Sequence, residues 1–523
     1  MNTWFGAHLV RSAAEAGSRV ALVFGDQVWT YAELELAVRR TVARLASFGV
    51  RGGDRVVMQG AARPEALVTL FAVTRMGAVL VPLHPQVTAG ELAVVCEETT
   101  PAAVVGDEGF PPATGSGSDS GSGLKPGPGS GSRVGAGSGA GVGPASGSRR
   151  DASAGLRLTW ADLRAEDDGP AAPVGDPPAG SDVAVIAFTS GTSGRPKGVA
   201  LTHDNLRWSM VNGLARLPFG DRDTALVATP LAHVAVLGGI PQYTWARRGT
   251  VILAPRFDPD LFLDLVRDHG VTCAFAVPAM SALLARHPRF GGGDLATLRW
   301  ILSGGSPART ATREQFRERG IGVVNSYGLT ETAAGVTYSA PDDAATSTGS
   351  AAPHAELVVV RADGSAAPAG TPGEIWVRGP SVAAGYWTAA GPKPVTDAEG
   401  WFHSGDRGRL DAEGRLEVVG RLKDTIITGG ENIDPAEVEN ALADMAGVVE
   451  VAVSGTPDPV WGEIVTAYLV SDADEPSLDD VRAHLDGRLA RHKWPRRVRL
   501  VPALPRGATG KLQRQRLSTL LDD

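Results

Sequence analysis

Residues 189–198, TSGTSGRPKG, combine small hydroxyl side chains, three glycines and one lysine directly after an apolar segment, residues 183–188. The apolar segment is typical of a buried strand. Glycines allow backbone N–H groups to approach phosphate oxygens closely, hydroxyl groups add further donors, and the lysine brings a positive charge. The segment therefore predicts a loop that wraps a polyphosphate. The candidate ligands are Thr189, Ser190, Gly191, Thr192, Ser193, Gly194 and Lys197.

This segment is not a Walker A loop. That motif needs Gly-Lys followed by Ser or Thr, whereas Lys197 lies between Pro196 and Gly198. The alternative interpretation is a flexible Gly/Ser linker, which the chain contains elsewhere. A linker needs neither the preceding strand nor the Pro-Lys-Gly ending, so we favour the phosphate loop.

Length, charge and cysteine content restrict the class of protein. A chain of 523 residues is too long for one ordinary core, so we expect two or more domains. The formal net charge of -8 argues against general binding to nucleic acid. Cys96 and Cys273 lie far apart and give neither a CxxC metal site nor a disulfide framework. We find no signal peptide and no apolar run of about 18 residues, and we expect a cytoplasmic protein.

The N-terminal part of the chain alternates between short β-rich segments and helical periodicity, which favours an α/β fold with a largely parallel sheet. Thr30 and Glu33 form a capping-box signature before a helix predicted at 31–48. A strand at 55–59, a helix at 65–76 and a strand at 78–82 predict a βαβ unit. Further strands are expected at 181–188, 225–229, 250–253, 272–276 and 299–302, with a helix at 260–268.

Two changes of composition divide the rest of the chain. Residues 111–150 consist mainly of Gly, Ser, Ala and Pro and cannot bury enough apolar surface to offset their chain entropy, so we expect a disordered insertion. Short strands with polar alternation begin near residue 357 and predict a small antiparallel or barrel-like region. From residue 424 onward, a compact α+β region follows that is long enough to fold on its own.

Four further motifs carry groups suited to nucleotide chemistry. NSYGLTET, residues 325–332, offers an aromatic ring for a flat base and the carboxylate of Glu331 for a magnesium ion. WFHSGD ends in Asp406, whose carboxylate can accept two hydrogen bonds from a ribose. Taken alone, either segment is also compatible with an ordinary junction or turn. Residues 420–439 combine a charged junction with paired glycines, and PRGATGKLQR places Lys511 in a glycine-bearing loop near the end of the chain.

In this order and spacing, the five motifs resemble the adenylate-forming (AMP-binding) superfamily of acyl-CoA synthetases, aryl-CoA ligases, luciferases and peptide-synthetase adenylation domains. The resemblance covers the chain apart from the insertion. It implies an N-terminal domain over 1–422, with layered α/β subdomains and the small β region, and a small mobile C-terminal domain over 424–523. It also implies that ATP activates a carboxylic acid as an acyl-adenylate, which the thiol of coenzyme A then attacks. ATP, Mg²⁺ and coenzyme A are therefore expected.

The resemblance also implies roles for individual residues. The loop from Thr189 to Lys197 holds the β- and γ-phosphates, Thr330 contacts the α-phosphate, and Glu331 supports the metal. Lys511 stabilises the negative charge that develops on the α-phosphate. The residues implied around the adenine, ribose and α-phosphate are Gly305, Ser306, Pro307, Ser326, Tyr327, Gly328, Asp406 and Arg421.

The C-terminal part of the resemblance implies a change of domain orientation. Lys423 matches the hinge position, and rotation there brings either Lys511 or the loop with Gly429 and Gly430 to the active site. The two glycines leave a channel for the pantetheine arm of coenzyme A. For Lys423 and Lys511 the alternative is a solvated surface lysine. The basic run within 491–497 either meets the phosphates of coenzyme A or forms a solvated face.

The sequence gives fewer indications of the acyl pocket than of the nucleotide site. His233 matches the gating histidine of the family, with a satisfied core histidine as the alternative, and Ala232 stands where many relatives have phenylalanine. No Asp or Glu occurs between Asp223 and Asp258, which disfavours an α-amino acid. Mostly apolar walls suit a medium fatty, branched or aromatic acid. The wall candidates are Ala232, Val236, Leu237, Trp245, Ala276, Val277, Ser303 and Gly304.

Acyl-CoA synthesis is the function that these motifs favour. One alternative is a stand-alone ligase that passes the acyl group to a separate carrier protein or to a nitrogen nucleophile. Another is a sensor that binds AMP or an acyl-adenylate without turnover. The sensor is disfavoured because Lys511, Glu331 and Asp406 are the residue types that catalysis needs.

Overall fold

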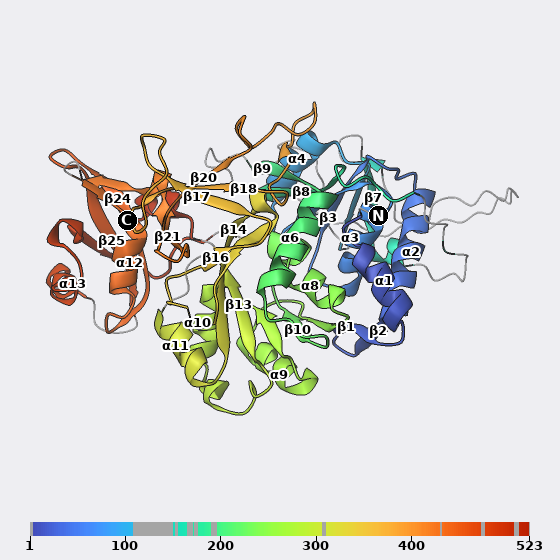
Figure 1. The fold of residues 1–523 in the computed structure, drawn as a ribbon, viewed down its shortest axis with the longest axis horizontal. Coiled ribbons are helices and arrows are strands. Elements are labelled where there is room, and N and C mark those ends of the chain that lie inside the picture. The colour runs from blue at the N-terminus through green and yellow to red at the C-terminus, as the bar shows by residue number, and fades with distance from the viewer. Residues whose placement is uncertain are drawn as a thin grey trace, which may run out of the picture.

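Sequence order runs across the molecule in the computed structural model. The N-terminal half, blue to green, occupies one side, the yellow strands lie in the middle, and the orange and red C-terminal region forms the other end (Figure 1). The insertion predicted at 111–150 lies outside the described residues except for Arg150. The described residues are 4–107, 150–151, 155–164, 171, 176–189, 196–305, 310–341, 343–428, 431–471, 476–506 and 512–521.

Among the described residues, one sheet has nine strands. Its adjacent strands from β14 to β1 run parallel, and β2, β15 and β16 add antiparallel pairs at the edges. Gly304 of β13 pairs with Ser326 of β14, so the carboxyl ends of these strands lie at the same edge. In order across the sheet, the strands are β16 (Ser350–Ala351), β15 (Ala334–Tyr338), β14 (Gly322–Leu329), β13 (Trp300–Gly304), β12 (Cys273–Phe275), β10 (Thr224–Val227), β11 (Thr250–Leu253), β1 (Val20–Phe24) and β2 (Gln27–Thr30).

A second sheet in the described part of the chain has eight strands and is also parallel at its centre. The predicted βαβ unit is present, because β3 and β4 are parallel and α3 connects them. In order across this sheet, the strands are β19 (Gly385–Tyr386), β9 (Lys197–Thr202), β8 (Val183–Thr189), β4 (Val79–Leu83), β3 (Arg55–Gln59), β5 (Ala103–Gly106), β7 (Gly155–Thr159) and β6 (Arg150–Asp151).

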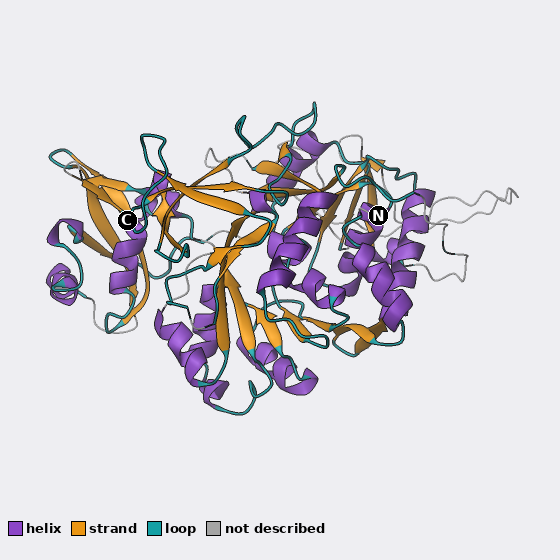
Figure 2. Cartoon of the chain, viewed as in Figure 1, coloured by secondary structure: helices purple, strands orange, loops and turns teal. Residues whose placement is uncertain are grey.

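Helices pack between and outside the two sheets (Figure 2). Val56 and Met58 of β3 belong to the core shared with Val227 of the nine-stranded sheet, while Val57 belongs to a separate core that includes residues of α4. Burial on both faces explains why these strands are almost continuously apolar. The helices of this region are α1 (Ala7–Ala16), α2 (Tyr31–Ser47), α3 (Pro64–Arg75), α4 (Ala89–Thr99), α5 (Trp160–Leu163), α6 (His203–Arg216), α7 (Val234–Leu237), α8 (Ile240–Ala246), α9 (Pro259–His269), α10 (Pro278–Arg286) and α11 (Thr310–Glu318).

The capping box at the start of α2 is confirmed. The Glu33 N–H donates to Thr30 Oγ1 at 3.2 Å, and the Glu33 carboxylate accepts from the Thr30 N–H at 2.7 Å. The helix ends at Ser47, one residue before the predicted end. Strands β3 and β11 have the predicted bounds.

The predicted small β region is an open four-stranded antiparallel sheet within residues 343–428, and not a closed barrel. Its core contains Val359, Ile375 and Leu416, and it also receives Tyr327 from the nine-stranded sheet. The nucleotide motif around Tyr327 therefore lies where the two sheets meet. The strands are β17 (Glu356–Val360), β18 (Gly373–Arg378), β20 (Phe402–Leu410) and β21 (Leu416–Arg421).

The C-terminal region has its own α+β core, as predicted. Val438 and Leu442 of α12 pack with Val453 and Val465 of a mixed sheet. Within the described part of the chain, every helix is too short or too polar to span a lipid bilayer. The elements of this region are β22 (Ile426–Thr428), β23 (Glu431–Ile433), α12 (Pro435–Leu442), β24 (Val448–Asp458), β25 (Gly462–Ser471), α13 (Leu478–Leu485) and β26 (Arg497–Leu500).

Candidate active site

The predicted phosphate loop connects two antiparallel strands. Thr189 is the last residue of β8 and Lys197 is the first of β9, and the two pair directly across the hairpin. The Thr189 hydroxyl donates to the carbonyl oxygen of Lys197 at 3.4 Å. The predicted ligands from Ser190 to Gly194 lie outside the described residues, so the structure fixes the two ends of the loop.

A tyrosine connects the lysine of this loop with the predicted metal ligand. The hydroxyl of Tyr386 donates to Glu331 Oε1 at 3.0 Å, and the ammonium of Lys197 lies 5.3 Å from the centroid of the same ring. Burial, and secondly the Glu331 carboxylate, raise the pKa of Tyr386 above its ordinary value. The phenol therefore keeps its proton near neutral pH and acts as the donor.

Thr330 and Glu331 belong to a tight turn after β14, the 3₁₀ helix η2 (Thr330–Thr332). The buried Thr332 hydroxyl accepts from the Leu329 N–H at 2.9 Å and lies 2.8 Å from the Ala334 carbonyl oxygen. Ala333 follows with a φ of 56° and Ala334 with a φ of 127°, values that non-glycine residues rarely adopt. Thr332 thus stabilises a strained turn that fixes the direction of Glu331.

Two glycines predicted in the nucleotide site, Gly305 and Gly328, lack a side chain for different structural reasons. Gly305 has a φ of +87°, and open space surrounds the position of its missing side chain. A Cβ added at Gly328 would lie 1.9 Å from the carbonyl oxygen of Ala334. Gly328 is therefore required by the neighbouring strand β15, whereas Gly305 leaves room for a ligand. Ser306 and Pro307 lie outside the described residues.

Tyr327, Asp406 and Arg421 come together at the junction of the two sheets. The hydroxyl of Tyr327 donates to Asp406 Oδ2 at 2.9 Å, and Arg421 Nε lies 3.0 Å from Asp406 Oδ1. Asp406 is 5% exposed, and it pairs with Arg421 across β20 and β21. Burial first, and then the Asp406 charge, hold the pKa of Tyr327 well above its ordinary value. The Asp406 carboxylate thus accepts hydrogen bonds from a charged partner and from a neutral donor.

The donor chemistry fits a magnesium ion that ATP brings with it. Among the described residues, no group of three or more His, Cys, Asp or Glu side chains is arranged to hold a metal ion. Magnesium bound to nucleotides commonly uses one or two carboxylates together with substrate phosphates. The Glu331 carboxylate is oriented by Tyr386 and lies on the turn that follows β14, so it suits this arrangement.

His233 caps the short helix α7. Its Nδ1 accepts from the Ala235 N–H at 3.2 Å, so the neutral ring carries its proton on Nε2. Ala232 is partly buried beside it, and Val236 and Leu237 are buried in the same helix. These residues lie between β10 and α8, beyond the carboxyl end of β10.

The other predicted wall residues differ in their burial and in their position relative to the strands. Ala276 and Ser303 are buried at the carboxyl ends of β12 and β13, and Val277 is partly buried at the start of α10. Trp245 is fully buried, its indole N–H donates to the Ala21 carbonyl oxygen at 2.8 Å, and its ring packs on Phe71. Trp245 therefore belongs to the core between the sheets, and we leave it out of the acyl pocket. Gly304 has only ordinary contacts around its missing side chain.

The C-terminal region contacts the small sheet through α12. Asp434 caps α12 by accepting from the Ala436 N–H at 2.9 Å, and a Cβ added at Gly420 would lie 2.1 Å from Asp434 Oδ2. Burial raises the pKa of Asp434 to about 6. Lys423, the predicted hinge, is exposed in the 3₁₀ helix η3 (Leu422–Asp424).

Lys511, Gly429 and Gly430 lie outside the described residues, and their roles stay predictions. The residues that follow Lys511 are anchored, because the Arg514 guanidinium bonds to the Glu439 carboxylate of α12 and to the Val453 carbonyl oxygen of β24. The base of the preceding loop is also closed, since Arg506 and Leu512 form a β-bridge.

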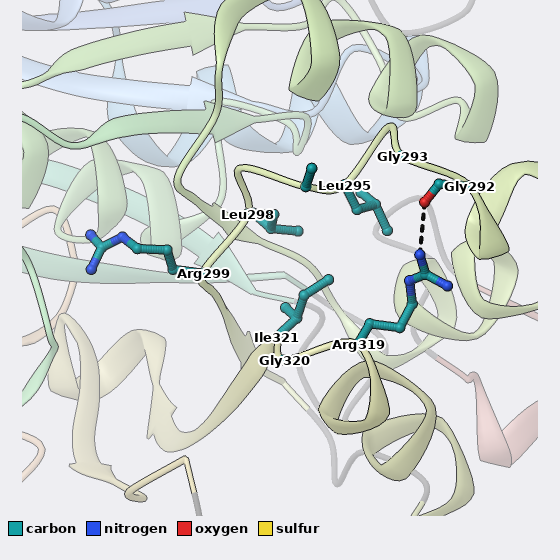
Figure 3. A pocket seen from close by; sticks show the side chains of 9 residues that line it. Gly292, Gly293, Leu295, Leu298, Arg299, Arg319, Gly320 and Ile321 are labelled. Carbon is teal, nitrogen blue, oxygen red and sulfur yellow. Dashed lines mark hydrogen bonds between the residues drawn. The ribbon is translucent and has the colours of Figure 1, made fainter.

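A hollow of about 350 Å³ lies away from all these residues (Figure 3). It lies beside the amino ends of β13 and β14, at the opposite edge of the nine-stranded sheet from Gly304 and Tyr327. The Arg319 guanidinium donates to the Gly292 carbonyl oxygen at 2.7 Å, and the Arg299 side chain points away from the apolar floor (Figure 3). The lining residues are Gly292, Gly293, Leu295, Ala296, Leu298, Arg299, Arg319, Gly320 and Ile321.

The sequence motifs missed one residue of this site and the structural role of another. Tyr386 lies in the segment GYW, which has no chemical signature of its own, and only the pairing of β19 with β9 brings it beside Lys197. Thr332 is part of the predicted motif, but its role in fixing the turn was not foreseen. A short aromatic strand after a Gly-rich turn was the one signal available for Tyr386.

Family profiles and relatives match almost the whole chain. The profile of the AMP-binding enzyme family matches residues 9–387, and that of the AMP-binding enzyme C-terminal domain matches residues 437–511. A feruloyl-CoA synthase from an Amycolatopsis species is 38% identical over 516 residues, which is 98% of each chain. An indoleacetate–CoA ligase from Aromatoleum aromaticum is 33% identical over 537 residues, covering 100% of this chain and 98% of the relative.

A solved enzyme has the same fold. O-succinylbenzoate coenzyme A synthetase (MenE) from Bacillus subtilis, solved with ATP and a magnesium ion, has a TM-score of 0.83 and 29% sequence identity. The match covers 98% of this chain and 99% of that chain. The same enzyme in complex with its acyl-adenylate intermediate has a TM-score of 0.82.

Proposed function

This chain belongs to the AMP-binding enzyme family and is an AMP-forming acid–thiol ligase that uses ATP, magnesium and coenzyme A, and we propose that its acid is aromatic and carries no second charge. The observation that carries the proposal is that residues 229–239, the segment that borders the predicted acyl pocket, contain no Asp, Glu, Lys or Arg. The two named relatives act on feruloyl and indoleacetate groups, which supports an aromatic acid.

The charged residues that follow this segment in the sequence lie near acidic residues or are exposed. Arg247 lies 3.9 Å from exposed Asp221, Arg248 pairs with Glu15, and Arg256 is exposed. A second carboxylate or an ammonium group on the acid would lose its hydration in the pocket without gaining an ion pair, which is unfavourable. Val236 and Leu237, the predicted wall residues of α7, are both apolar and give a charged group no partner.

The first half-reaction is attack of the acid carboxylate on the α-phosphate of ATP, with release of pyrophosphate. In our proposal the hairpin ending at Lys197 holds the β- and γ-phosphates, and Thr330 contacts the α-phosphate. Asp406 and Arg421 hold the ribose, and Tyr327 covers the adenine. Magnesium, when bound, neutralises charge on the phosphates, and fixed charges of this kind lower a phosphoryl-transfer barrier more than acid–base groups do.

The second half-reaction transfers the acyl group to the coenzyme A thiol and releases AMP. We propose that the C-terminal domain from residue 424 presents Lys511 in the first half-reaction and the Gly429–Gly430 loop in the second, with Lys423 as the hinge. His233 lies beside the reactive carboxylate in this proposal. ATP and coenzyme A are cytoplasmic metabolites, so we propose the cytoplasm as the compartment.

The test is pyrophosphate release with matched acids. The panel pairs cinnamate, ferulate and indoleacetate with octanoate, phenylalanine and phenylsuccinate, each assayed with ATP and magnesium, with and without coenzyme A. We expect the three neutral-tailed aromatic acids to have the highest kcat/KM and to give thioesters with coenzyme A. A higher kcat/KM for octanoate, or for either acid with an added charge, would overturn the proposed acid class.

The acceptor is tested in the same experiment. Hydroxylamine traps acyl-adenylate chemically, and a purified acyl carrier protein replaces coenzyme A in a parallel reaction. Thioester formation on coenzyme A is expected. Hydroxamate formation together with transfer to the carrier protein alone would assign the enzyme to carrier loading.

A further inference from the structure

Tyr386 is fixed on both sides of its backbone. It pairs with Val199 of β9, two residues after Lys197, and its N–H and carbonyl groups both bond to Lys393 at 2.8 Å. The next residue, Trp387, donates its backbone N–H to the Gly198 carbonyl oxygen at 2.7 Å and its indole N–H to the Glu98 carbonyl oxygen at 3.3 Å. The backbone that carries the Tyr386 ring is therefore fixed in place.

The side chain of Tyr386 lies between two groups of opposite charge. Its hydroxyl donates to the Glu331 carboxylate, and its ring faces the Lys197 ammonium. Within the described residues, neither Glu331 nor Lys197 forms an ion pair within 4.0 Å. A tyrosine satisfies both groups at once, because a phenol donates to a carboxylate and the face of its ring attracts a cation. The two charges are kept apart without either being left unsolvated.

The backbone supports the same arrangement. The Ala383 N–H donates to the carbonyl oxygen of Glu331 at 2.8 Å, so the segment that carries Tyr386 holds Glu331 through its main chain and through its side chain. If Tyr386 were absent, the lysine and the carboxylate would be free to approach each other. A direct ion pair would then compete with the phosphates for Lys197 and with magnesium for Glu331.

We propose that Tyr386 is a positioning residue for the adenylation half-reaction. It keeps the Lys197 ammonium and the Glu331 carboxylate separate and directed, so that the ammonium meets the phosphates and the carboxylate meets the magnesium ion that ATP carries. This inference rests on the roles proposed above for Lys197 and Glu331. Tyr386 touches neither the acid nor coenzyme A in this assignment, so the second half-reaction does not depend on it.

Two variants separate the functions of the ring and the hydroxyl. Tyr386→Phe keeps the ring over Lys197 and removes the hydroxyl from Glu331, whereas Tyr386→Leu removes both. Trp387→Phe is the matched control, since it removes the bond of the adjacent side chain to Glu98 and leaves Tyr386 unchanged. Thermal unfolding of each variant reports whether the fold is retained.

The main readout is nucleotide binding to the full-length protein, measured by titration calorimetry with ATP and magnesium and again with ATP and EDTA. Tyr386→Phe is expected to weaken binding of ATP with magnesium by about 3–10-fold, the effect of one lost hydrogen bond, and to leave binding with EDTA unchanged. Tyr386→Leu is expected to weaken both. The magnesium concentration needed for half-maximal pyrophosphate release should rise in parallel, while thioester formation from supplied acyl-adenylate stays at the wild-type rate.

Wild-type binding and magnesium dependence in Tyr386→Phe would overturn the inference. Equal losses in Tyr386→Phe and Trp387→Phe would also overturn it. They would indicate a general structural role, which would affect both half-reactions alike. If the wild-type protein itself releases no pyrophosphate with any acid, the proposed acid class fails and the calorimetry still decides the role of Tyr386.

Discussion

The two edges of the nine-stranded sheet differ in what they offer to a ligand. At the carboxyl edge, Tyr327 and Arg421 converge on one buried carboxylate, Asp406. At the amino edge, the hollow of about 350 Å³ is lined by glycines, aliphatic side chains and two arginines, and both arginines have partners within the protein. Polar groups converge at the carboxyl edge, whereas the polar groups around the hollow are engaged by the protein itself.

Convergent polar groups identify the functional edge. All parallel strands direct their carboxyl ends to the same side, so loops with polar residues accumulate there and ligands bind beyond those ends. At the amino edge the same type of pair, Asp223 with Arg299, joins the two segments that directly precede β10 and β13. Asp223 also accepts from the Thr272 hydroxyl at 2.7 Å and from the Gly220 N–H at 2.6 Å, which indicates a structural role.

The largest effect is expected at the carboxyl edge for Glu331→Gln. The amide cannot supply the negative charge that supports magnesium, so adenylation should slow by about 10²–10³-fold. The measurement is single-turnover formation of acyl-adenylate, with thioester formation from supplied acyl-adenylate as the control. A similar loss in both half-reactions would remove Glu331 from the metal site.

Asp406→Asn should have the next largest effect. Asparagine still accepts a hydrogen bond from Tyr327 but gives Arg421 no ionic partner and the ribose a weaker acceptor. The KM for ATP should rise by about 10–100-fold, which corresponds to hydrogen bonds that involve a charged group. Steady-state kinetics with ATP varied at saturating acid checks this, and an unchanged KM would break the assignment of the ribose site.

Arg299→Met tests the matching pair at the amino edge. Asp223 is 4% exposed and would lose its ionic partner, but Thr272 and Gly220 still donate to it. Because Arg299 is half exposed, the free energy of unfolding should fall by only about 1–2 kcal/mol. Urea denaturation measures this, and the KM for ATP should equal that of the wild type.

The smallest effect is expected for Arg319→Ala in the hollow. The change removes one hydrogen bond to Gly292 and the stacking of the guanidinium on Phe290, so the free energy of unfolding should change by about 0.5 kcal/mol or less. Pyrophosphate release should be unaffected. A tenfold loss of adenylation would reverse the contrast between the edges and point to a ligand site in the hollow.

Local patterns predicted the elements well, because their signals lie within a few residues. The capping box at Thr30 determines where α2 begins, and a short continuous apolar segment determines β3. The small region was predicted as antiparallel or barrel-like, because its short strands alternate with polar residues. Its open edge was not predictable, since closure depends on register between distant strands.

The site could be predicted only in part from the sequence. The family resemblance implied that Asp406 and Arg421 both lie at the ribose, and the structure places Arg421 Nε 3.0 Å from Asp406 Oδ1. Gly328 was implied near the nucleotide, and the structure adds that the Ala334 carbonyl oxygen leaves no space for a side chain there. Trp245 follows the pocket motif in sequence, yet its indole N–H is bonded to Ala21. Whether a residue lies at the site or in the core depends on which distant strand lies against it, and no local pattern contains that information.

The short connection between β21 and β22 limits how the C-terminal region can move. Arg421 ends β21 in an ion pair with Asp406, and Ile426 begins β22 with 1% of its surface exposed. Residues 422–425 lie between them, which amounts to about eight soft backbone torsions. If Lys423 is the hinge, a large rotation must be concentrated in these few torsions. Few intermediate orientations are then available, so the two catalytic poses should interconvert as discrete states and not by gradual bending.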